Sequence, residues 1–121
     1  MQSAPAVVLV VEDEILIRMD VVDQLAEIGF AVLEAGSGQE ALAIIESEER
    51  VDVVFTDVDM PGSVNGIDLA RTVDERWPTI AIIVTSGQAI IRADELPAGS
   101  LFYPKPYQSA KVHQAIQELL A

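Results

Sequence analysis

The chain has 121 residues, a length that suits a single domain over residues 1–121, and half of them are hydrophobic, which is enough for a core. It has no cysteine, no basic signal segment and no apolar run near the roughly 18 residues that span a bilayer, so disulfides and thiolate metal sites are excluded and a soluble cytoplasmic protein is expected. The net charge of −13 disfavours direct binding to nucleic acid.

Apolar residues alternate along the chain between short continuous runs and helical spacing. The short runs, rich in β-branched residues, predict strands at 7–11, 31–34, 51–56, 80–84 and 101–103. Helical spacing predicts helices over 14–28, from Ser37 or Gly38 onward, over 67–77, and after a cap at Ser109. The segment 86–100 has room for only a short helix because it contains Pro97 and Gly99. This alternation is typical of an α/β fold with a parallel sheet covered on both faces.

Polar side chains follow four of the five predicted strands, at the point where each strand ends. They are Glu12, Asp13, Asp57, Asp59, Thr85, Ser86 and Lys105. The carboxyl ends of parallel strands share one edge of a sheet, where α/β proteins place their chemistry. Taken singly, these residues also have structural explanations: Asp13 as a helix cap, Asp59 in a turn with Pro61, and Thr85 as the last residue of a strand.

Clustered carboxylates repel one another unless a cation lies between them. Oxygen ligands without cysteine favour Mg²⁺, which keeps several waters and takes one or two carboxylates. Lys105 supplies a second positive charge. A carboxylate held beside Mg²⁺ and a lysine is equipped to attack phosphorus and to form an aspartyl phosphate.

Four motifs together resemble those of response-regulator receiver domains of the CheY-like kind. They are "VVED" after the start, "FTDVDMPG" after the third strand, "IIVTSG" at the fourth and "PKPY" after the fifth. The resemblance covers essentially the whole chain and implies a doubly wound, five-stranded parallel sheet in the flavodoxin-like order 2-1-3-4-5.

The resemblance also implies a magnesium site. Asp13 and Asp57 match direct ligands, the backbone carbonyl of Asp59 matches a third, and Glu12 matches an acid that acts through water.

Asp57 matches the phosphoacceptor of the family, a role that is expected with a histidine kinase or histidine phosphotransfer protein as the phosphoryl donor and an unknown downstream protein. Lys105 matches the lysine that pairs with the phosphate, and Thr85 the hydroxyl that moves to it. Phe102 matches the aromatic whose rotamer switches, and the bond from Lys105 to Pro106 is expected to be cis. The domain would act as a signalling module and not as an enzyme, since it assists only its own phosphorylation and dephosphorylation.

The chain departs from the family pattern in several places. "MPGSVNG" is one residue longer than the usual turn, Ser86 replaces a smaller residue, and Phe102 lacks the hydroxyl of the more frequent tyrosine. The helix expected within 86–100, which commonly contributes to the partner surface in this family, is short.

Two other functions are open. A degenerate receiver would bind partners without phosphorylation, although the set Asp13, Asp57, Thr85 and Lys105 is complete. "DVD" is also similar to the motif of haloacid dehalogenase-like phosphatases, but that motif usually follows the first strand, and Pro61 stands where a threonine or valine is expected.

Overall fold

The computed structural model describes residues 5–47, 50–60, 62, 64–87, 93–105 and 108–120. Its five strands are β1 (Val7–Val11), β2 (Ala31–Ala35), β3 (Val53–Asp57), β4 (Ala81–Ser86) and β5 (Leu101–Pro104). Its α-helices are α1 (Ile15–Ile28), α2 (Gly38–Glu46), α3 (Gly66–Arg76) and α4 (Ser109–Leu119). Between β4 and β5 the described residues form a single 3₁₀ turn, Ala93–Glu95. None of the helices in these ranges is both long and apolar enough to cross a bilayer.

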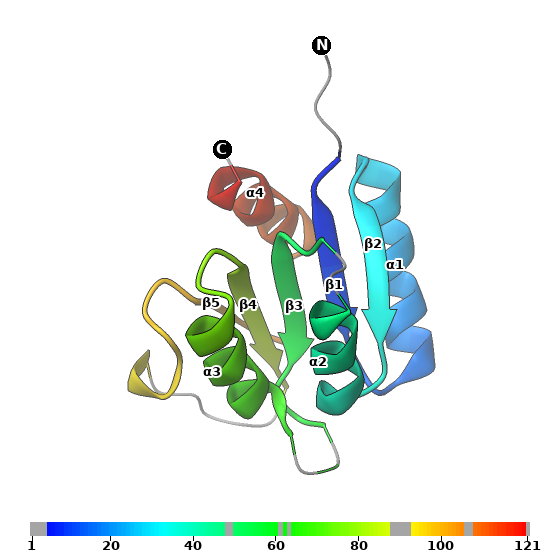
Figure 1. Ribbon diagram of the computed structural model, residues 1–121. Coiled ribbons are helices and arrows are strands. Elements are labelled where there is room, and N and C mark those ends of the chain that lie inside the picture. The colour runs from blue at the N-terminus through cyan, green and yellow to red at the C-terminus, as the bar shows by residue number, and fades with distance from the viewer. Residues whose placement is uncertain are drawn as a thin grey trace.

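All strand pairs are parallel, and the order is β2-β1-β3-β4-β5, as predicted. In Figure 1, α2 and α3 lie in front of the sheet, and α1 and α4 lie behind it. Side chains therefore alternate between two cores: Leu9 and Val11 face the α2 and α3 side, whereas Val8 and Val10 face the α1 and α4 side. Burial on both faces explains why β1 is a continuous apolar run.

Several predicted boundaries move by one or two residues. β3 begins at Val53 and ends at Asp57, while β4 runs on to Ser86, so that both strands reach further into the polar edge than expected. The prediction that Ser109 caps the last helix is wrong, because Gln108 occupies the cap position and Ser109 is the first helical residue. Ser37 does cap α2, since its side chain accepts the N–H of Glu40.

The connection from β3 to α3 packs against the start of α2. A Cβ at Gly38 would lie 2.5 Å from the carbonyl oxygen of Val64, so only glycine fits there. At the other end of the connection, a Cβ at Gly66 would lie 2.2 Å from the carbonyl oxygen of Asp57. These two close approaches fix the path of the chain directly after Asp57. Pro61 and Ser63, within the predicted longer turn, lie outside the described residues.

Candidate functional site

The site lies at the carboxyl ends of the strands, which point down in Figure 1. An open cavity of about 400 Å³ at this edge is lined by Asp13, Glu14, Asp57, Asp59, Gly87 and Lys105. Four of these residues are among those that the strand ends predicted. The sheet therefore brings together side chains from the ends of β1, β3 and β5 that are up to 92 positions apart in the sequence.

Asp57 is placed by the most buried strand of the sheet. All five residues of β3 are buried, and Asp57 itself is only 5% exposed. It pairs in register with Thr85 of β4, and the backbone N–H of Val58 donates to the Thr85 carbonyl at 2.8 Å. The central position of β3 thus holds the Asp57 backbone rigidly while its carboxylate faces the cavity.

Three carboxylates meet in the site. One oxygen each of Glu12, Asp13 and Asp57 lies within 4.8 Å of the others, a spacing that a single metal ion can bridge. Asp13 does not cap α1, because Glu14 occupies the cap position and offers no side-chain hydrogen bond. The structural explanation for Asp13 is therefore wrong, and its carboxylate stays in the cluster.

Lys105 supplies the positive charge of the site. Its Nζ lies 3.3 Å from Oδ2 of Asp57 and 3.7 Å from Oε2 of Glu12. The Lys105 N–H donates to the carbonyl of Ser86 at 2.9 Å, which continues the β4–β5 pairing one residue past the strand. A Cβ at Gly87 would lie 3.5 Å from Lys105 Cδ, which is an ordinary contact, so the lysine chain runs directly beside position 87. Pro106, and with it the expected cis bond, lies outside the described residues.

Glu12 is the acid whose protonation the site changes most. Its burial raises its pKa to about 7, and the negative charge of Asp57 acts in the same direction. The N–H of Glu14, which donates to Glu12 Oε1 at 3.2 Å, and the ammonium of Lys105 oppose that rise. Desolvation outweighs both, so without a metal Glu12 keeps its proton to a higher pH than an ordinary glutamate does.

The two predicted switch residues lie on the adjoining strands β4 and β5. Thr85 is 2% exposed and stands next to Asp57 across the β3–β4 ladder. Phe102 pairs with Val84 and packs half-buried against the core on the α2 and α3 side. Both positions fit a route from Asp57 to the edge of the sheet, and their switching remains a prediction.

Two residues of the site were not predicted in their present roles. The hydroxyl of Ser86, which is buried, donates to Oδ2 of Asp59 at 2.9 Å. The N–H of Asp59 lies 3.3 Å from Oδ1 of Asp57. Ser86 thus ties Asp59 to β4, which explains a hydroxyl at a position where a smaller residue is usual.

The second residue is Arg18, whose side chain on α1 donates a hydrogen bond to the Glu12 carbonyl. A polar residue at the end of β4 was a usable signal for Ser86, whereas Arg18 lies on a helix face and gave none.

Comparisons with known proteins agree with this arrangement. The model of the response regulator receiver domain family matches residues 8–117. The sensor kinase CckA of Brucella abortus is 40% identical over 122 residues, which is 98% of this chain and 13% of CckA. The chain thus spans a small part of that relative.

Solved structures show the same fold. A response regulator receiver protein from Sinorhizobium medicae superposes with a TM-score of 0.90 at 29% identity, covering 96% of this chain and 94% of that one. The response regulator TrrA of Thermotoga maritima, in complex with Mg²⁺ and BeF, has a TM-score of 0.85 at 27% identity, covering 94% and 98%.

Proposed function

The chain belongs to the response regulator receiver domain family, and from that premise we propose that Asp57 is the residue that accepts a phosphoryl group in a two-component or phosphorelay pathway. One observation carries the assignment of Asp57. Its carboxylate faces the ammonium of Lys105 at 3.3 Å and belongs to the three-carboxylate cluster. A nucleophile beside positive charge in a shaped pocket is what phosphoryl transfer requires.

The pocket suits Mg²⁺. Its donors are all oxygen, the ligand type that this cation prefers, and the carboxylates are close enough to share one ion. Asp13 and Asp57 would bind it directly, Glu12 through a water, and Asp59 through its backbone carbonyl. The related TrrA structure with Mg²⁺ supports this proposal. When bound, the ion neutralises charge on the transferring phosphoryl oxygens.

The positions of the side chains support the following transfer. A carboxylate oxygen of Asp57 attacks the phosphorus of a phosphohistidine, the O–P bond forms as the P–N bond breaks, and the imidazole leaves with a proton from solvent. The Lys105 ammonium, already beside Asp57, then pairs with the new phosphoryl oxygens. The Thr85 hydroxyl, one strand away, donates to another of them. Water later attacks the phosphorus and restores the carboxylate, so the domain works as a signalling module and not as an enzyme that turns over a substrate.

The partners follow from this chemistry. The donor is a histidine kinase or a histidine phosphotransfer protein, and the receiver of the signal is another protein. The overall charge of −13 argues against direct contact with nucleic acid. A cytoplasmic location and a single domain over residues 1–121 belong to the same proposal.

Intact-mass spectrometry tests the assignment. The protein is incubated with acetyl phosphate, with Mg²⁺ or with EDTA, as wild type, Asp57→Asn and the control Asp20→Asn, which changes an exposed aspartate on α1. We expect one added phosphoryl group in the wild type and the control with Mg²⁺, and none with EDTA or in Asp57→Asn.

Other results would favour other functions. A wild type that gains no phosphate from acetyl phosphate or from a phosphorylated histidine phosphotransfer protein would favour the phosphorylation-independent binding module. Steady release of phosphate from unrelated phosphate esters would favour the phosphatase.

A further inference from the structure

Arg18 of α1 reaches from the helix to the backbone of the site. Its Nη1 donates to the carbonyl oxygen of Glu12 at 2.9 Å, and its Nε lies 3.1 Å from Oε1 of Glu34, near the end of β2. The Arg18 side chain is 19% exposed, so this is a half-buried guanidinium with two fixed partners. A planar guanidinium that bonds two groups at once holds both in a defined orientation.

The surrounding chain is shaped around this guanidinium. A Cβ at Gly36 would lie 2.9 Å from Arg18 Nη1, so the absence of a side chain at position 36 leaves the space that Arg18 fills. On the other side, the N–H of Glu12 donates to the carbonyl of Ala35 at 3.1 Å. The Glu12 backbone is therefore held at both its N–H and its carbonyl.

The carbonyl that Arg18 binds belongs to the peptide unit joining Glu12 to Asp13. Because a peptide unit is planar, fixing its oxygen fixes the direction in which the Asp13 backbone leaves. We propose that Arg18 is a positioning residue, which sets Asp13 in the geometry that a divalent cation requires. The inference rests on the proposed magnesium site.

Charge and positioning predict opposite effects when Arg18 is removed. The guanidinium is a positive charge beside an acidic cluster, so its charge alone opposes the binding of a cation. Removing it would tighten Mg²⁺ binding if charge were its only influence. If Arg18 positions Asp13, removing it weakens Mg²⁺ binding, because Mg²⁺ demands nearly ideal octahedral geometry.

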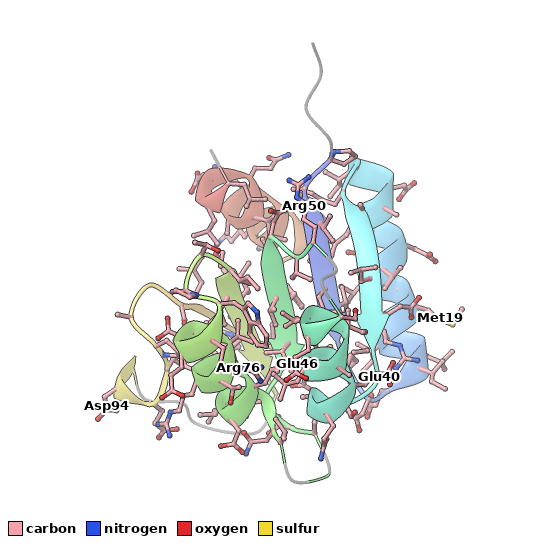
Figure 2. The ribbon with its side chains drawn as sticks, viewed as in Figure 1. Met19, Glu40, Glu46, Arg50, Arg76 and Asp94 are labelled. Carbon is pink, nitrogen blue, oxygen red and sulfur yellow. The ribbon has the colours of Figure 1, made fainter. Side chains whose placement is uncertain are left out.

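Isothermal titration calorimetry of Mg²⁺ with the unphosphorylated protein distinguishes the effect of charge from the effect of positioning. We expect Arg18→Met to raise the dissociation constant about 10-fold, the lower end of the range for loss of an outer-shell partner. Arg50→Met is the matched control. It removes the same charge and also breaks an ion pair, with Asp52, but Arg50 lies at the opposite end of the sheet (Figure 2). We expect it to leave the constant unchanged or slightly lower.

Gly36→Ala gives a second test that changes no charge. The new Cβ pushes against the far end of a flexible side chain, which moves more easily than the backbone, so the protein is expected to fold with a displaced guanidinium. We expect weaker Mg²⁺ binding, by about 3-fold if part of the outer-shell effect is lost. In metal-free protein, amide hydrogen exchange at Asp13 and Glu14 should be faster in both Arg18→Met and Gly36→Ala, with exchange in β3 unchanged.

The outcomes separate this inference from the proposed function. Mg²⁺ binding to Arg18→Met and Gly36→Ala that equals or exceeds that of the wild type overturns the role of Arg18 alone. Wild-type protein that binds no Mg²⁺ overturns the magnesium site and the role of Arg18 together, whereas phosphorylation of Asp57 is judged separately by mass spectrometry.

Discussion

Glu12 is a carboxylic acid that the fold shields from water and places between one ammonium and a second carboxylate. Its folded-state pKa of about 7 exceeds the 4.5 of an ordinary glutamate, so the folded protein keeps a proton that the unfolded chain releases. The stability linked to this proton is complete below pH 4.5 and is lost as the pH rises through 7. A bound cation would remove the preference for a proton on Glu12.

Glu12→Gln should therefore flatten the pH dependence of stability. With EDTA present, the free energy of unfolding of the wild type is expected to fall by up to about 3 kcal/mol from pH 4.5 to 8 on account of Glu12, and the variant should lack that fall. The lowered pKa of His113 acts equally in both proteins and cancels in the difference. Urea unfolding at pH 5 and pH 8 measures the change in the free energy of unfolding for both proteins. Equal changes in the wild type and in Glu12→Gln would contradict the role given to Glu12.

At the scale of elements, α3 begins directly after the site and is held by a reciprocal cap. The Asn65 side chain accepts the N–H groups of Ile67 and Asp68, while Asp68 accepts the N–H of Asn65. The spacing of apolar residues predicted α3 but not this cap, because a cap is set by the residue that precedes the helical pattern. Periodicity locates the body of a helix better than its ends.

Asn65→Ala should destabilise the protein by about 1 kcal/mol, the usual loss for an N-cap whose side chain bonds the first turn. Gln108→Ala is the control, since Gln108 occupies the cap position of α4 without a side-chain cap bond. Its effect should stay within about 0.5 kcal/mol, as for an ordinary surface change. Urea denaturation gives both changes in the free energy of unfolding from the shift of the midpoint, provided that the slope is unchanged. Equal losses of stability in Asn65→Ala and Gln108→Ala would refute the special role of the Asn65 cap.

Contacts between elements were harder to predict than the elements themselves. Arg76 of α3 pairs with Glu46 of α2 (Figure 2), and it stacks over the Trp77 ring at 4.4 Å. Neither contact was predicted from the sequence. Spacing within one helix reveals neighbours three or four residues apart, but it holds no information on which helix lies alongside.

For the whole molecule, alternating periodicity and the right-handed crossover were enough to predict a parallel sheet and the edge at which the acids gather, whereas the strand order came from the resemblance to receiver domains. The positions of Asp13, Asp57 and Lys105 followed, because the strand ends bring them together. Arg18 did not follow, since its partner is a backbone carbonyl, which every residue carries. The site was predictable where side-chain chemistry defines it and unpredictable where main-chain geometry does.

The uneven distribution of charge along the chain predicts how salts change the melting temperature. Residues 1–60 hold a net −12 of the total −13, and the carboxylate cluster is drawn from this half. MgCl₂ should raise the melting temperature more than NaCl of equal ionic strength, because only the first binds the folded state specifically. In Asp13→Asn, the melting temperature should rise by the same amount in MgCl₂ and in NaCl, because screening of charge remains while specific binding of Mg²⁺ is lost. Thermal denaturation followed by circular dichroism measures this, and equal shifts in the wild type would contradict a specific site.

Among the described residues, β5 is the last strand at one edge of the sheet, and this has a consequence for the behaviour of the protein in concentrated solution. The Lys105 N–H points inward to β4, so by alternation the inward N–H groups are those of Leu101 and Tyr103, and the outward positions are Phe102 and Pro104. Proline has no N–H, which leaves Phe102 as the single outward donor within β5. A strand with one donor is a poor template for a strand from another molecule, so β5 resists edge-to-edge aggregation and strand exchange even in concentrated solution.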